Sequence, residues 1–327
     1  MADAFPPVNY EFIRLATKPT AQLCYSFSPS TASEKTNPAL IVFVNGLGLP
    51  QVGWAPTIAK LRELSPQGLP AILTYDRFGQ GQSTDRDPND EGAADPRHAH
   101  DCISAIRDMR QLITQISKEK LGIDNPNNAK LVMVSNSIGC SLVRLYAQEY
   151  PGTVSGIAFL DSTLTDTDFV SLVPDPDSSD FDGSKLPSGV TPEHLRNARE
   201  QIGKRFHPDV GNQEGLSRKN LFQLLPHAGS PPLHKEGEKG PYITVLGHDF
   251  DYFAERCEID MAIPAAVTQT YVNPYWHGYN EGLAKLTSSE RSRGPVQAPG
   301  AGHFIQADKP SFVAEKIHEV LQSLKDE

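Results

Sequence analysis

The sequence predicts a doubly wound α/β fold, in which helices cover both faces of a mostly parallel, eight-stranded sheet. Short β-rich runs alternate with segments of helical spacing, and from the third run onward these runs are almost continuously apolar, as in strands covered on both faces. The first two runs lie close together and predict an antiparallel hairpin that begins the sheet. The eight expected strands are Glu11–Ala16, Ala21–Phe27, Ala39–Val44, Ala71–Tyr75, Lys130–Val134, Gly156–Leu160, Tyr242–Leu246 and Pro295–Gln297.

Apolar residues at helical spacing predict the helices that separate these strands. One helix is expected over Thr57–Leu64. A second follows the polar loop 87–100, with Ile103, Ile106, Met109, Leu112, Ile113 and Ile116 on one face. A closing helix begins near Ser311 and presents Val313, Ile317, Val320, Leu321 and Leu324 as one apolar stripe. These helices supply the two outer layers of the predicted fold.

The regular alternation of strands and helices stops between Asp161 and Tyr242. A connection of this length between neighbouring strands indicates an insertion. The segment contains a loop rich in Asp, Ser and Gly, and then a helix start of the Thr-Pro-Glu type at 191–193. We therefore expect residues 163–237 to form a small helical cap after the sixth strand, and residues 1–162 and 238–327 to form the core.

The composition is that of an ordinary globular protein. The chain has 327 residues, of which 38% are hydrophobic, and a formal net charge of −10, so a nucleic-acid partner is not expected. The amino terminus lacks signal-peptide features, and no apolar run is long enough to span a bilayer, which predicts a soluble, cytoplasmic protein. Four widely spaced cysteines predict reduced thiols, with neither a disulfide framework nor a zinc site.

Ser137 stands where an expected strand turns directly into a helix. In a parallel sheet such a turn lies at the carboxyl edge, where open α/β folds bind ligands. Such a turn needs small neighbours because the strand and helix backbones approach closely, and the residues here are Ser135-Asn136-Ser137-Ile138-Gly139. They approximate G-x-S-x-G, with serine in place of the first glycine, so Ser137 is a candidate nucleophile. A simple helix N-cap is the alternative interpretation.

A serine nucleophile needs a histidine to accept its proton and a third group to orient that histidine. His303 lies in a glycine-flanked loop after the last expected strand, and Asp249 follows the end of the seventh. Asp161, at the end of the sixth strand, is the alternative acid, and Asp251 is also nearby. The sequence leaves this choice open, with Asp249 preferred.

Taken together, these segments resemble the α/β-hydrolase superfamily, in the branch of serine esterases, lipases and peptidases with a small cap. The order Ser137, Asp249, His303 matches the chain order of that family's triad. The segments 43–54 and 75–84 resemble its loop after the third strand and its Asp-x-x-Gly-x-Gly-x-Ser turn. Asn45 occupies the position where many relatives have histidine. The resemblance covers nearly the whole chain, from the first hairpin to the last helix.

The resemblance implies a serine hydrolase that cleaves a small carboxylic ester or lactone through an acyl-enzyme. The backbone N–H groups of Leu47 and Ile138 would form the oxyanion hole, and neither a metal nor an organic cofactor is expected. The expected partner is a small-molecule substrate, and the sequence selects no oligomeric state. Residues expected near the substrate are Gly46, Leu47, Leu49, Trp54, Phe78, Phe222, Leu225 and Trp276, although packing is the more favoured role for Trp276.

Other functions fit the same residues. Amidase or peptidase, thioesterase, acyltransferase, lyase and cofactor-free peroxidase chemistry would use the same triad. A non-catalytic protein that binds a small ligand is the alternative from a different class. Serine at position 137 disfavours relatives that react through an aspartyl ester.

Overall fold

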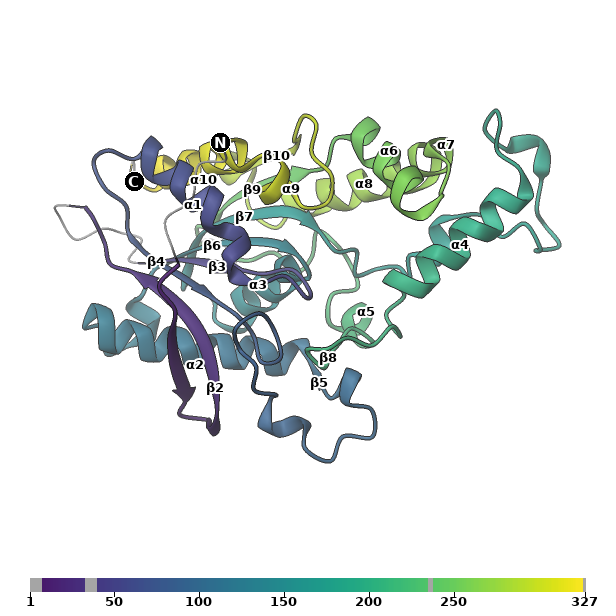
Figure 1. Cartoon of the computed structure of the whole chain (residues 1–327). Coiled ribbons are helices and arrows are strands. Elements are labelled where there is room, and N and C mark those ends of the chain that lie inside the picture. The colour runs from purple at the N-terminus through teal and green to yellow at the C-terminus, as the bar shows by residue number, and fades with distance from the viewer. Residues whose placement is uncertain (1–7, 33–39, 235–237, 326–327) are drawn as a thin grey trace, which may run out of the picture.

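A computed structural model describes residues 8–32, 40–234 and 238–325 of the chain. Residues 1–7, Ala39 at the start of the third expected strand, and position 237 at the end of the expected insertion therefore lie outside the described residues. Within the described residues, eight strands form one sheet in the order β1-β2-β4-β3-β6-β7-β9-β10 (Figure 1). Their bounds are β1 Glu11–Leu15, β2 Lys18–Ser28, β3 Leu40–Val44, β4 Ala71–Tyr75, β6 Leu131–Ser137, β7 Val154–Ser162, β9 Tyr242–Gly247 and β10 Ser292–Gln297.

The predicted fold class is confirmed. The pairs β1–β2 and β2–β4 are antiparallel, and all other neighbours in the sheet are parallel. The central strands continue past the apolar runs that predicted them, because the hydrogen bonds of the ladder do not depend on side-chain polarity. Ser135 and Asn136 of β6, for example, pair with Phe159 and Leu160 of β7. This continuation carries β6 as far as Ser137.

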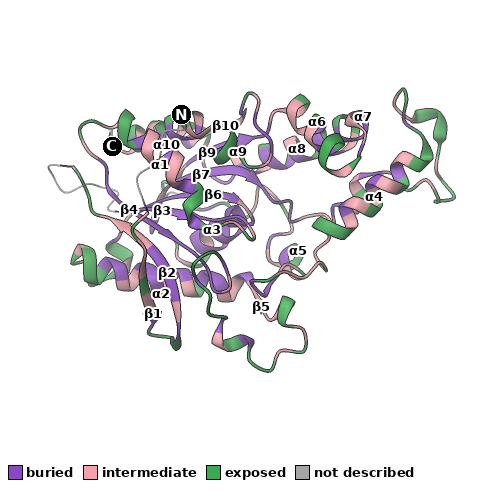
Figure 2. Cartoon of the chain, viewed as in Figure 1, coloured by how far each residue is buried: buried purple, intermediate pink, exposed green. Residues whose placement is uncertain are grey.

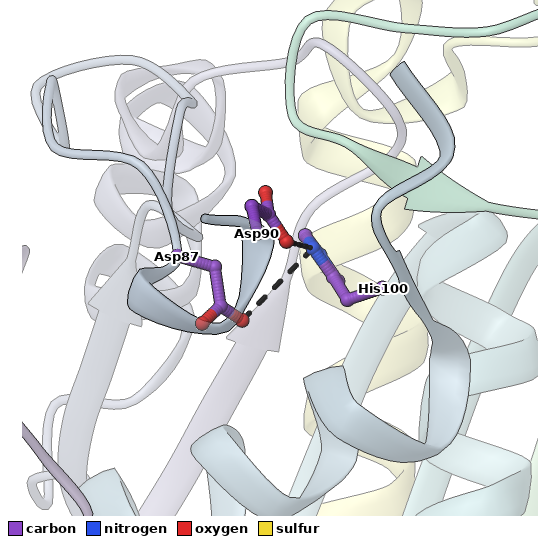
Figure 3. A group of neighbouring side chains, drawn as sticks. All are labelled: Asp87, Asp90 and His100. Atoms are coloured by element: carbon purple, nitrogen blue, oxygen red, sulfur yellow. Dashed lines mark hydrogen bonds and ion pairs between the residues drawn. The ribbon is translucent and has the colours of Figure 1, made fainter. Parts of the chain in front are cut away.

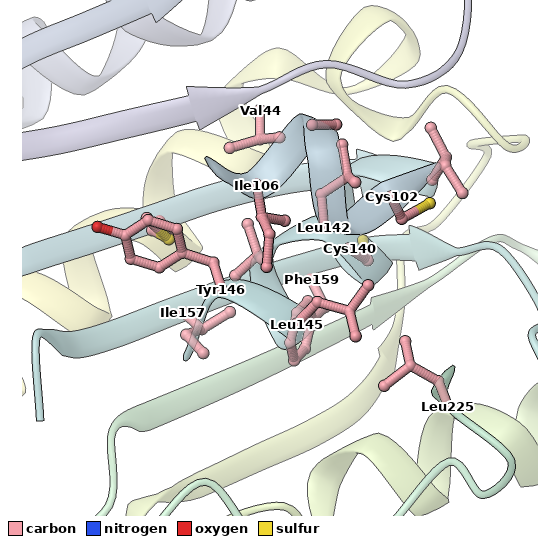
Figure 4. Close-up of a cluster of buried hydrophobic side chains, with 14 of the residues drawn as sticks. Val44, Cys102, Ile106, Cys140, Leu142, Leu145, Tyr146, Ile157, Phe159 and Leu225 are labelled. Carbon is pink, nitrogen blue, oxygen red and sulfur yellow. The ribbon is translucent and has the colours of Figure 1, made fainter. Parts of the chain in front are cut away.

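Two helical layers enclose the sheet (Figures 1 and 2). Helices α1 (Ala55–Leu64) and α10 (Pro310–Lys325) pack together on one face, and α2 (Cys102–Leu121) and α3 (Ile138–Glu149) pack together on the other. Successive residues of β3 alternate between the two cores, with Val42 on the side of α2 and α3 and Phe43 on the side of α1 and α10. Figure 4 shows part of the larger core, where α3 lies over β6 and β7. The three predicted helices are confirmed within α1, α2 and α10.

The connection between β7 and β9 holds α4 (Pro192–Phe206), β8 (Leu216–Ser217) and α5 (Leu221–Leu224). Figure 1 shows α4 extending away from the sheet. Thr191 caps α4 through a reciprocal pair of hydrogen bonds with His194. Strand β8 pairs with β5 (His100–Asp101), which ties this insertion to the start of α2. That residues 163–237 behave as a separate cap stays a prediction.

A second helical segment lies between β9 and β10 and contains α6 (Phe250–Met261), α7 (Ala265–Val267) and α8 (Asn273–Ala284). The chain also forms α9 (Ile305–Asp308), the π-helical turn η7 (Thr268–Val272) and the 3₁₀ turns η1 Gln51–Trp54, η2 Pro88–Asp90, η3 Pro96–His98, η4 Pro126–Asn128, η5 Val170–Leu172, η6 Gly183–Lys185 and η8 Ser289–Arg291. Among the described residues, no helix combines the length and apolar character needed to cross a lipid bilayer.

Candidate active site

Ser137 lies at a strained turn between β6 and α3. Its backbone has φ 56° and ψ −126°, a conformation that is costly for a residue with a Cβ atom. The turn brings α3 so close to β3 that a Cβ atom on Gly139 would lie 2.5 Å from the carbonyl oxygen of Val44. Ser135 replaces the family's first glycine without conflict, because its buried hydroxyl donates to the carbonyl of Ala158 at 3.4 Å. The structure thus places Ser137 at the carboxyl end of β6, directly before α3, and its role as nucleophile stays a prediction.

His303 lies in the loop that follows β10, with its imidazole on the wall of the cavity that Ser137 also lines. Its Nδ1 atom is 2.7 Å from Oδ2 of Asp161. This contact fixes the ring and leaves Nε2 as the nitrogen that can accept a proton. Asn136, the neighbour of Ser137, donates from Nδ2 to the carbonyl of His303 at 2.9 Å, so the loop is anchored to the nucleophile turn. Ser137 and His303 share the cavity but make no direct hydrogen bond in this structure.

The preference for Asp249 as the partner of His303 is wrong. The Asp249 carboxylate caps α6, accepting backbone N–H groups from Asp251 and Tyr252, and it also accepts the N–H of Gly300 at 2.8 Å. These bonds, led by that from Gly300, lower the pKa of Asp249 and occupy its oxygens. Asp161, near the end of β7, which lies directly beside β6, reaches His303 instead.

Asp161 is buried, with none of its side chain exposed. Burial alone would raise the pKa of its carboxyl group, but His248 and His303 at its two oxygens outweigh that effect and lower the pKa to about 2. The carboxylate is therefore ionised at neutral pH. The sequence offered no signal for the contact of His248 with Asp161 beyond the place of His248 at a strand end.

The loop after β3 lies against the nucleophile. A Cβ atom on Gly46 would be 3.3 Å from Cβ of Ser137, and Leu47 lines the same cavity as Ser137. Ile138 is the first residue of α3, so its N–H belongs to the helix terminus that lacks intrahelical partners. Leu47 thus lines the Ser137 cavity and Ile138 directly follows Ser137, and the role of their backbone N–H groups as oxyanion donors stays a prediction.

Arg77 and Glu214 bind backbone groups of the loop after β3. Arg77 donates to the carbonyl oxygens of Asn45 and Gly46 at 2.8 and 2.9 Å. Glu214, which comes from the insertion, forms a buried ion pair with Arg77 at 2.7 Å and accepts the backbone N–H of Gly48. The insertion therefore contributes directly to the shape of the loop beside Ser137.

A cavity of about 690 Å³ opens beside Ser137 and His303. Its other lining residues are Leu47, Thr163, Phe169, Arg205, Phe206, Arg218, Tyr252, Phe253, Arg256, Cys257, Asp260, Met261, Trp276, Gly302, Phe304 and Asp308. They come mainly from the insertion and from α6, and much of the wall is apolar or aromatic. The sequence did not identify the α6 residues, because an aromatic residue on a helix resembles an ordinary core residue.

The expected substrate residues meet different outcomes. Trp276 lines the cavity, 5.5 Å from His303 between ring centroids, and donates its indole N–H to the carbonyl of Ser162. The expectation for Trp54 is wrong, since its indole is buried and donates to Asn45. Phe222 lines a neighbouring cavity of about 580 Å³ rather than that of Ser137. Phe78 and Leu225 are buried in the core and line neither of these two cavities, and Leu49 packs against Gly46.

The sequence model of the Alpha/beta hydrolase family matches residues 41–316 of the chain. The chain belongs to the α/β hydrolase family. No curated protein sequence matches this hydrolase. Its fold is similar to that of a haloalkane dehalogenase loop variant from Bradyrhizobium elkanii, at 13% identity and a TM-score of 0.57, with 98% of each chain covered.

Two further solved α/β structures share the fold. A thermophilic esterase from Thermogutta terrifontis is 18% identical, with a TM-score of 0.50 over 97% of this hydrolase and 99% of the esterase. Alpha/beta hydrolase domain-containing protein 10 from mouse is 14% identical, with a TM-score of 0.52 over 97% of this hydrolase and 99% of the mouse chain. At these identities the likeness concerns the fold alone.

Asp87, Asp90 and His100 form a cluster that has the residue types of a metal site and is paired within the protein (Figure 3). His100 Nδ1 is 2.8 Å from Asp90, and Lys18 places its ammonium group 2.5 Å from Asp87. Lys18 also pairs with Asp108. The carboxylates thus have cationic or imidazole partners from the protein, and none of these residues lines the Ser137 cavity. The cluster joins the loop 87–100 to β2 and α2.

Proposed function

We propose that the protein is a serine hydrolase that cleaves a small carboxylic ester or lactone, with Ser137 as nucleophile, His303 as base and Asp161 as the acid that orients His303. The observation that carries this proposal is the position of His303, which is fixed by a buried carboxylate 2.7 Å away on the wall of the cavity that contains the strained Ser137 turn. The family assignment supports hydrolytic chemistry, and the triad and the substrate class are proposed here.

The proposed reaction is acyl transfer to water. Ser137 Oγ attacks the carbonyl carbon while His303 Nε2 takes its proton, and the N–H groups of Leu47 and Ile138 donate to the developing oxyanion. Collapse of the tetrahedral species expels the alcohol, which receives the proton from His303. A water molecule then loses a proton to His303 and attacks the acyl-enzyme, and collapse of the second tetrahedral species returns the proton to Ser137 and releases the acid. Asp161 balances the positive charge on His303 during both steps.

The cavity supports a substrate with apolar groups on the reacting carbonyl or its leaving group. Phe169, Phe253, Met261 and Trp276 provide an apolar wall beside Ser137 and His303. A serine at the nucleophile position also argues for acyl chemistry rather than displacement through an aspartyl ester.

The test is hydrolysis of p-nitrophenyl esters of increasing chain length, and of simple lactones followed by acid release. Ser137→Ala and His303→Ala should each lower kcat by about 10³-fold or more. Ser323→Ala and His277→Ala, which change a serine and a histidine outside the cavity, serve as matched controls. A fluorophosphonate should label the wild type at Ser137. Folded wild-type protein that neither turns over any of these substrates nor takes the label would contradict the proposal.

A further inference from the structure

A second histidine is bound to the proposed catalytic acid. Asp161 uses Oδ2 for His303, while its Oδ1 lies 2.8 Å from Nδ1 of His248 and accepts the backbone N–H of His248 at 3.2 Å. The side chain of His248 is 1% exposed and that of Asp161 is fully buried. One buried carboxylate therefore bridges two imidazoles, and water does not reach the inner one.

The contacts of His248 determine its protonation. Its Nε2 lies 3.1 Å from Oδ1 of Asn273, and the Asn273 amide group is oriented by donation from its Nδ2 to the carbonyl of Phe250 at 3.0 Å. Both ring nitrogens of His248 therefore face oxygens that can only accept, one from an amide and one from an ionised carboxylate. A neutral imidazole has a single N–H and would leave one of these buried contacts without a proton. Two N–H groups satisfy both contacts.

The surroundings favour the charged ring. Burial lowers the pKa of His248, but the attraction of Asp161 and the hydrogen bonds to Asp161 and Asn273 outweigh it, so the pKa is raised above the ordinary value. The ring of His248 also lies 4.0 Å from that of Phe253 and meets Trp276 edge to face at 5.3 Å. An aromatic shell of this kind accommodates a cation.

The other charged groups near His248 are few. Asp249 lies on the same loop, and its carboxylate is directed to backbone N–H groups, while His303 lies on the far side of Asp161. Helix α8 contributes the uncharged Asn273 and Trp276, and α6 contributes Phe253. Asp161 is thus the direct ionic partner of His248 among these neighbours.

We propose that His248 is a positioning residue that remains an imidazolium throughout the working pH range, holding Asp161 in place and offsetting part of the negative charge that faces His303. A carboxylate that already balances one imidazolium attracts a proton to a second imidazole less strongly. The charge state of His248 stands on the structure alone, and its effect on His303 rests on the proposed function.

The first test reads the charge of His248 without a substrate. In the full-length protein labelled with ¹⁵N-histidine, both ring nitrogens of His248 should give imidazolium signals between about pH 5 and 8. The signals are assigned by their loss in His248→Asn. A neutral-tautomer pattern for His248 within that range would overturn the proposal, whether or not the protein hydrolyses any ester.

The second test follows the effect on His303. In His248→Asn the amide can place an N–H near the former Nδ1 and so keep the bond to Asp161 without the charge. In the pH profile of kcat/KM, the acid limb should then move to higher pH by about 1–2 units. The values of kcat and KM on the pH-independent plateau should change little. Asn273→Leu, which removes the acceptor at Nε2, provides a second variant and should move the limb in the same direction.

These outcomes separate the two proposals. Wild-type turnover with an acid limb that stays in place in both folded variants would overturn the role of His248 and leave the esterase proposal intact. An inactive wild type with an imidazolium signal at His248 would overturn the esterase proposal and leave the charge assignment standing.

Discussion

Asp161 and His303 form the hydrogen bond that defines the site, with 2.7 Å between Oδ2 and Nδ1 across 142 positions of sequence. Asp161 is the penultimate residue of β7, the strand next to the one that carries Ser137, and it adopts a positive φ of 42° where the pairing register of the two strands shifts. The backbone conformation and the complete burial of Asp161 indicate that this residue is held in one orientation toward His303.

Replacement of each carboxylate by an amide tests whether Asp161 or Asp249 is the catalytic acid. We expect Asp161→Asn to lower kcat for a p-nitrophenyl ester by about 10⁴-fold, since an amide does not hold the histidine tautomer or balance its charge. Asp249→Asn should retain kcat with a modest loss of thermal stability, because asparagine still caps α6 but its Nδ2 cannot accept the N–H of Gly300. Equal losses in the two variants would contradict the assignment of Asp161.

The buried pair of Arg77 and Glu214 predicts a large stability effect. Glu214→Leu leaves Arg77 as an uncompensated buried charge and should lower the free energy of unfolding by about 3–5 kcal/mol, measured by urea denaturation. The exposed pair Glu193–Arg196 is the control, and Glu193→Gln should cost less than about 1 kcal/mol. A small effect of Glu214→Leu would show that the pair is dispensable for stability.

The charges around Lys18 predict a pH dependence of stability. Burial, partly opposed by Lys18, raises the pKa of Asp108 to about 6. The folded state therefore binds this proton more tightly than the unfolded state, where the pKa is about 3.9. The stabilisation is present at low pH and is lost as the pH rises from about 4 through about 6.

Urea denaturation of Asp108→Asn at two pH values measures this effect. Between about pH 4 and about pH 7, the free energy of unfolding of the variant should rise by about 1–3 kcal/mol relative to that of wild type, because asparagine does not titrate. A difference between variant and wild type that is independent of pH would show that Asp108 is ionised throughout this range.

The turn at Ser137 predicts that Gly139 tolerates no side chain. Its Cβ atom would lie 2.5 Å and 2.9 Å from the carbonyl oxygens of Val44 and Asn45, both of them backbone atoms. Gly139→Ala should therefore lower the melting temperature and abolish ester turnover. Gly278→Ala in α8 is the matched control, since nothing lies within 4 Å of that Cβ position, and it should be neutral or stabilising by up to about 1 kcal/mol.

Phe169 is one of four residues that line both cavities, and its truncation predicts a change in chain-length preference. Its side chain lines both the Ser137 cavity and the neighbouring cavity that contains Phe222. In Phe169→Ala the two cavities should join. The ratio of kcat/KM for long acyl esters to that for short ones should then rise by about tenfold, because the end of a long acyl chain can be buried in the second cavity. Phe222→Ala changes only the neighbouring cavity. It should leave the ratio of kcat/KM for long esters to that for short esters as in wild type. An unchanged ratio in Phe169→Ala would contradict the joined cavity.

The sequence predicted the sheet, helices within α1, α2 and α10, the turn at Ser137 and the loop of His303 from local patterns. Strand periodicity and the need for small residues at a tight turn act over a few positions, so they are visible in the sequence. The sequence did not identify the partner of His303, because Asp161 and Asp249 both lie at strand ends and the choice between them depends on tertiary contacts, such as the bond that directs Asp249 to Gly300. Trp54 was misplaced for a similar reason, since its hydrogen bond to Asn45 depends on how η1 packs against β3.

The bond from Glu214 to the loop beside Ser137 has a consequence for protein engineering. An insertion that only covered the cavity could be exchanged between relatives to alter substrate choice. Here the insertion also supplies an acceptor for Gly48 and a counter-ion for Arg77. A chimera that replaces the insertion without restoring a carboxylate at this point would lose turnover for every substrate, so the insertion and the loop after β3 must be transplanted as one unit.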